Sequence, residues 1–114
     1  MADVRPGHGR ITEISGFTYE QVWAAALRVA ATHFKVRAAD EAKGVIRAER
    51  DVDVWSWGEW VGIFITPRAA GASSYDLEVV SRKKLMGQLT GQNWEKKIIE
   101  QVLFALSNPE KPLP

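Results

Sequence analysis

The chain has 114 residues, 46% of them hydrophobic and 25% charged, which is the size and composition of one globular domain rather than of a disordered segment. Fifteen Lys and Arg against fourteen Asp and Glu give a net charge of +1, so the chain lacks the basic excess of nucleic-acid-binding proteins. Because it has no cysteine, disulfides, thiolate metal sites and cysteine nucleophiles are excluded, and no apolar run is long enough to span a membrane.

Residues 1–16 are rich in Gly and Pro and have little periodicity. This pattern predicts a flexible lead-in, with room for a short extended piece at 10–14. The same stretch has no apolar core of the kind a signal peptide needs, so no signal peptide is expected in the sequence as written.

A helix is predicted over 18–32. Thr18 is a natural N-cap, and Gln21 three residues later completes a capping box. Apolar residues then recur at helical spacing, at Tyr19, Trp23, Ala26, Leu27 and Ala30. The small side chains of Ala24, Ala26 and Ala30 are expected to face a sheet and to let the helix lie close to it.

Four strands follow, because apolar and polar residues alternate in four short runs, at 33–38, 45–50, 59–66 and 74–82. Short links predict an antiparallel meander. A second helix is expected from about Asn93 to Ser107, with a broad apolar face, and 108–114 reads as a tail. The expected fold is a single α+β domain over 17–107, a two-layer α-β-β-β-β-α sandwich with both helices on one face of the sheet.

The most unusual feature is the tryptophan-rich run Trp55-Ser56-Trp57-Gly58-Glu59-Trp60. Strict alternation puts Trp55, Trp57 and Glu59 on one face of a strand and Trp60 on the other. A bulge at Gly58 would bring all three indoles to one side. The cluster either covers the end of a small core or forms an exposed patch for a partner, and the candidate binding residues are Trp55, Trp57, Glu59 and Trp60.

A weaker candidate is the loop before the second helix. It follows two lysines, contains glycines and ends at a helix N-terminus, a combination that binds anions. The residues concerned are Lys83, Lys84, Gly91 and Asn93. The loop lacks the Gly-Lys-Ser/Thr ending of a phosphate-binding P-loop, and a plain connecting loop is the alternative.

Catalytic signatures are weak. His33 at the end of the first helix reads as a solvated or capping histidine, and Glu59 is a carboxyl between aromatic neighbours that could raise its pKa. An enzyme using either group in a cleft is the least favoured interpretation. We therefore expect no catalytic residue, no metal and no cofactor.

Several stretches together resemble the small α/β domains of bacterial envelope lipoproteins and related uncharacterised proteins, among them the C-terminal domains of the outer-membrane assembly lipoprotein. The residues that carry the resemblance are 15–17, 22–26, 43–48, 57–58, 93–95 and 98–99. The resemblance implies a scaffolding or interaction module at the cell envelope. The signal and the lipidated cysteine of such lipoproteins are missing here.

The leading hypothesis is thus a non-enzymatic interaction domain with an unknown protein partner at the envelope, periplasmic if a signal has been removed and otherwise cytoplasmic. The alternative is a helix-grip type of domain that holds an apolar small molecule between sheet and helices. Edge strands of so small a sheet are open to pairing between copies, which leaves a homodimer as an alternative to a monomer.

Overall fold

The computed structural model describes residues 4–7, 9–52, 57–69, 73–84 and 94–114. Within them the elements are, in chain order, β1 (Arg10–Ser15), α1 (Tyr19–His33), β2 (Lys35–Asp40), β3 (Val45–Val52), β4 (Trp57–Pro67), β5 (Ser74–Lys83) and α2 (Trp94–Ser107). The α+β class is confirmed. One more strand than expected precedes the first helix.

The sheet is antiparallel and has the strand order β1-β5-β4-β3-β2. β2 to β5 form the expected meander. β1 adds to the free edge of β5 in the register Arg10↔Val79 to Ser15↔Ser74, in the segment where the sequence left room for an extended piece. Only one of its side chains, Ile14, is buried in the core, so local hydrophobicity was a poor signal for this strand. Pairing with β5 satisfies the backbone groups of β1 that point toward β5.

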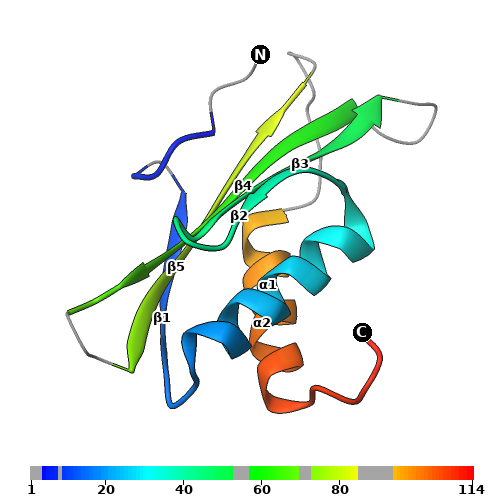
Figure 1. Ribbon diagram of the computed structural model, residues 1–114. Helices are drawn as coiled ribbons and strands as arrows, with labels where there is room; N and C mark the ends of the chain where they lie inside the picture. The colour runs from blue at the N-terminus through cyan, green and yellow to red at the C-terminus, as the bar shows by residue number, and fades with distance from the viewer. Residues whose placement is uncertain (1–3, 8, 53–56, 70–72, 85–93) are drawn as a thin grey trace.

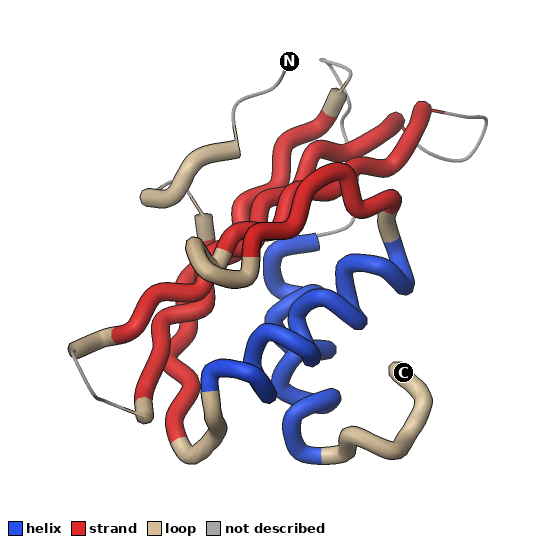
Figure 2. The backbone as a smooth tube through the Cα atoms, in the orientation of Figure 1, coloured by secondary structure: helices blue, strands red, loops and turns tan. Residues whose placement is uncertain are grey.

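Both helices pack on the same face of the sheet (Figures 1 and 2). α1 begins where the capping box predicts. The Thr18 hydroxyl accepts a hydrogen bond from the Gln21 amide at 3.1 Å, and the Gln21 side chain accepts one from the Thr18 amide at 2.8 Å. These two bonds satisfy backbone donors that the first turn of a helix leaves free.

The main core lies between the sheet and the helices. Ala26 and Ala30 are fully buried there and let α1 approach the sheet closely, as expected. Ala24 is an exception, because it is exposed. Residues four apart lie on one side of a helix, whereas residues two apart point about 200° away from each other, so Ala24 could not share the buried side with Ala26.

The alternation predicted for β4 is confirmed. Val61, Ile63 and Ile65 point into the core under the helices, while Trp60 and Phe64 point to the opposite face of the sheet, which we call the outer face. The pairing of β3 with β4 keeps one register on both sides of Gly58, with Arg50↔Glu59 and Val52↔Trp57. No bulge therefore re-phases this strand against β3.

Candidate functional site

Three of the residues predicted as site residues, Trp55, Gly91 and Asn93, lie outside the described part of the chain. Of Trp57 only the backbone is described, in its pairing with Val52.

The other four predicted site residues are Glu59, Trp60, Lys83 and Lys84, and the fold brings them to the same end of the sheet. Glu59 pairs with Lys83 across β4 and β5, and the Lys84 amide donates to the Gly58 carbonyl at 3.2 Å. The aromatic run and the basic end of β5 were separate candidates in the sequence. In the structure they are neighbours, although their side chains divide between the two faces of the sheet.

On the outer face, Trp60 lies within a network of charged side chains. We call this set, Lys35, Arg37, Glu49, Asp51, Trp60 and Lys84, the outer-face network. The Glu49 carboxylate accepts a 2.7 Å hydrogen bond from the Lys84 ammonium and another from the Arg37 guanidinium. Lys84 lies 3.6 Å from Asp51, which in turn pairs with Lys35 at 3.0 Å. The network has members on β2, β3 and β4 and ends at Lys84, the residue that follows β5.

These cations stabilise the ionised carboxylates. Hydrogen bonds from Lys84 and then Arg37 hold the pKa of Glu49 below its usual range, and the bond from Lys35 does the same for the pKa of Asp51. The Glu49 residue is only 8% exposed on a face that no helix covers. Its carboxylate is thus held in one place by its two partners rather than left free in solvent.

Trp60 is half-buried and provides an aromatic surface beside this carboxylate. The Lys84 ammonium lies 4.3 Å from the centre of the Trp60 ring, a cation–π geometry. The Trp60 side chain also packs against a small apolar cluster formed by Val4, Phe64 and Val80. The tryptophan is therefore neither free at the surface nor part of the main core.

On the helix side of the same sheet end, Glu59 is buried, and this burial raises the pKa of its carboxyl group. Lys83 and Arg50, its neighbours in register, oppose the rise, and Glu95 adds to it. Arg50 also lies over the ring of Trp94, at 5.5 Å from the ring centre. A carboxyl with a raised pKa is a candidate acid or base, but Glu59 does not line the pocket that lies between the two helices.

His33 lies half-buried in the last turn of α1 rather than freely solvated. Its ring lies 5.5 Å from that of Trp94, and its Nε2 forms a hydrogen bond with the side chain of buried Gln101. The Gln101 amide donates in turn to the Pro114 carbonyl at 3.0 Å. These contacts tie α1 to α2 and to the end of the chain, which makes His33 a packing residue.

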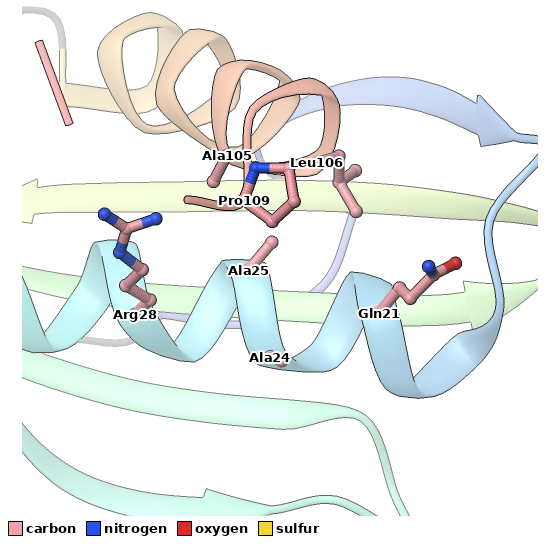
Figure 3. Close-up of a pocket in the computed structure, with 7 residues that line it drawn as sticks. All are labelled: Gln21, Ala24, Ala25, Arg28, Ala105, Leu106 and Pro109. Carbon is pink, nitrogen blue, oxygen red and sulfur yellow. The ribbon is translucent and has the colours of Figure 1, made fainter. Parts of the chain in front are cut away.

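The structure also has a pocket of about 220 Å³ between α1 and α2 (Figure 3). Its lining is mostly apolar, with an arginine and a glutamine from α1, and consists of Gln21, Ala24, Ala25, Arg28, Ala105, Leu106 and Pro109. Arg28 donates to the Lys111 carbonyl at 2.8 Å. The pocket lies between the two helices, whereas a helix-grip domain binds its ligand between sheet and helices, and it is smaller than the roughly 300 Å³ usual for ligand sites.

Sequence reasoning missed Arg37 and Glu49. A signal was present, because an antiparallel hairpin from 35–40 to 45–50 sets the basic residues of its first strand near the acid of the second.

Within the described residues, no group of His, Asp and Glu side chains is arranged to hold a metal ion, and neither helix has the length and apolar character of a membrane span. Comparison with models of protein families and with curated proteins finds no match to this chain.

Proposed function

We propose that this protein is a non-enzymatic interaction domain that binds a protein partner through the outer-face network. The observation that carries the proposal is the arrangement of Trp60, Lys84 and Glu49, an indole stacked under a cation whose carboxylate partner is held by a second cation. Aromatic residues and arginine are enriched in the centres of protein interfaces, where they contribute most of the binding energy.

The charge pattern favours a protein over a nucleic acid as the partner. The network alternates basic and acidic groups, with Lys35, Arg37 and Lys84 facing Glu49 and Asp51. A phosphate backbone would be repelled by the two carboxylates, whereas a partner with its own mixed charges can complement both signs. The resemblance to envelope domains adds the proposal that the partner is an envelope protein.

The test uses the full chain, immobilised, to capture partners from envelope and cytosolic fractions. Trp60→Ala should weaken capture, because truncating an interface centre costs about 2 kcal/mol or more, which is about thirtyfold in affinity. Leu103→Ala is the matched control, since Leu103 is an exposed apolar residue on α2, away from the outer face.

Equal capture by the wild type and by folded Trp60→Ala would contradict the proposal, as would equal loss with Leu103→Ala. Glu49→Arg gives a second arm, because reversing this charge should disrupt the network while the indole stays in place. Thermal unfolding of each variant shows whether the variant is folded, so that a loss of binding is not mistaken for the result of unfolding.

A further inference from the structure

The residues before β1 are bound to the outer face of the sheet, on the side opposite the helices (Figure 1). We call residues 4–7 and 9 the N-terminal strap. Val4 is 7% exposed and packs against Phe64 and Val80, with Trp60 at the margin of the same cluster. Within the predicted lead-in, Val4 is therefore an apolar anchor that holds the strap against the sheet.

Two charged side chains of the sheet bind the backbone of the strap. The Glu78 carboxylate, in a residue that is 7% exposed, accepts hydrogen bonds from the amides of Gly7 at 2.7 Å and Gly9 at 3.0 Å. At the other end, Arg47 donates to the Val4 carbonyl at 2.7 Å, and its guanidinium lies 5.6 Å from the centre of the Phe64 ring. We call Arg47, Glu78, Phe64 and Val80 the strap cradle.

The close approach of the strap requires glycine at two places. A Cβ at Gly9 would lie 2.2 Å from the Val79 carbonyl oxygen, which is main chain and cannot move aside. On the sheet itself, a Cβ at Gly62 would lie 2.9 Å from the Phe64 ring and 3.3 Å from the Cβ of Val4. The cradle thus has room for a backbone without a side chain at one point and for one apolar side chain at another.

We propose that the strap cradle is a peptide-binding site, that the strap is its intramolecular occupant, and that an extended, glycine-containing segment of a partner protein with one β-branched apolar residue takes its place. The inference rests on the proposed function in that the same outer face receives the partner. It adds the chemistry of the segment that is recognised.

The polar contacts of the strap cradle recognise main-chain groups. Glu78 and Arg47 bond to amides and a carbonyl, which any extended peptide carries, while Val4 supplies an apolar anchor and Gly9 allows the close approach. An empty cradle would leave the Glu78 carboxylate without two of its donors, at a cost that favours an occupant at all times. Exchange of one segment for another avoids that cost, as in peptide recognition through main-chain hydrogen bonds.

The tethered strap competes with any free peptide at an effective concentration on the order of millimolar, so the test first weakens it. The probe is a fluorescein-labelled peptide with the sequence of residues 2–9, and the readout is fluorescence anisotropy with the full chain. Val4→Asp puts a carboxylate into the apolar site formed with Phe64 and Val80 and releases the strap. We expect this variant to bind the probe at least tenfold more tightly than the wild type.

Two controls test the cradle itself. A probe with Asp in place of its valine should bind neither protein, and Val4→Asp combined with Glu78→Ala should lose the gain. A folded Val4→Asp variant that shows no gain overturns the proposal, as does a double variant that binds as tightly as the single one. If circular dichroism shows Val4→Asp to be unfolded, Val4→Ala repeats the test with a smaller expected gain.

If the wild type dimerises as its concentration rises and Val4→Asp abolishes the dimer, the cradle binds the strap of a second copy. That result would overturn the proposal that a segment of a different protein binds there. Failure of the probe to bind leaves the capture experiment with Glu49→Arg unaffected, because Glu49 lies outside the cluster that anchors the strap. The two proposals can therefore fail separately.

Discussion

Glu49 and Glu59 lie on neighbouring strands at one end of the sheet, and their surroundings shift their pKa values in opposite directions. Glu49 is on the outer face between Lys84 and Arg37, which stabilise its charge. Glu59 is on the helix side, where burial penalises the charge more than Arg50 and Lys83 favour it. Because both residues are glutamates, the opposite directions of their pKa shifts come from their surroundings on the two faces of the sheet.

Glu49→Gln is expected to lower the free energy of unfolding at pH 7. Because the pKa of Glu49 is lowered in the folded state, its ionised form stabilises the fold above its ordinary pKa of 4.5, and this contribution disappears as the pH falls through the lowered value. Urea unfolding of wild type and variant at pH 7 and pH 3 checks this, since the difference should shrink toward pH 3.

Glu59→Gln is the matched control, with the opposite sign. Its raised folded-state pKa means that stability falls as the pH rises from the ordinary value of 4.5 through the raised one, so at pH 7 the variant should be as stable as the wild type or more stable. An equal loss at pH 7 in both variants would show that the face of the sheet does not govern these groups.

At the scale of single elements, α1 has two kinds of small residue. Ala26 is fully buried against the sheet, whereas Ala24 is exposed and lines the pocket between the helices. The first sets how closely the helix approaches the sheet, and the second leaves part of the space seen in Figure 3. Closely packed interiors resist added volume, but an open pocket accepts it.

Ala26→Leu should therefore destabilise the protein by about 1–3 kcal/mol, the usual cost of overpacking a core. Ala24→Leu adds the same atoms to the same helix and should change stability little. The measurement is the free energy of unfolding in urea, compared between each variant and the wild type. A similar loss in both variants would mean that α1 is not seated on the sheet through the face containing Ala26.

For the molecule as a whole, the sheet separates a large core under the helices from a smaller cluster on the outer face. Of the three tryptophans whose side chains are described, Trp23 and Trp94 belong to the main core, at 7% and 5% exposure, while Trp60 is half-buried on the other side. The outer face is closed in part by the strap and in part by the charged network. Solvent access to the indoles should report this division.

Acrylamide quenching of tryptophan fluorescence tests the division on the intact protein. Trp60→Phe should lower the average quenching constant, because it removes an accessible indole. Trp94→Phe should leave the constant unchanged or raise it, because it removes a shielded one. If the quenching constant falls more with Trp94→Phe than with Trp60→Phe, Trp94 is the more accessible indole and the division described above is wrong.

Local pattern was sufficient for most elements. Thr18 and Gln21 mark the start of α1, the two-residue alternation identifies β2 to β5, and the same alternation assigns Ile63 and Phe64 to opposite faces. Such signals succeed because capping bonds and strand faces depend on residues close together in the chain. β1 was not among the four predicted strands, because it buries only one of its own side chains and pairs with β5, which is distant in the sequence.

By itself, the sequence determined the fold class, the helices, the central meander and the absence of cysteine chemistry. Only the tertiary structure decided that Glu49 is held between Arg37 and Lys84, that Lys84 lies over Trp60, and that Glu78 binds the strap. Each of these contacts joins residues from different elements, with a geometry set by the pairing of several strands. A pattern read along one segment holds no information on such distant partners, because the free energy that brings them together comes from the whole core.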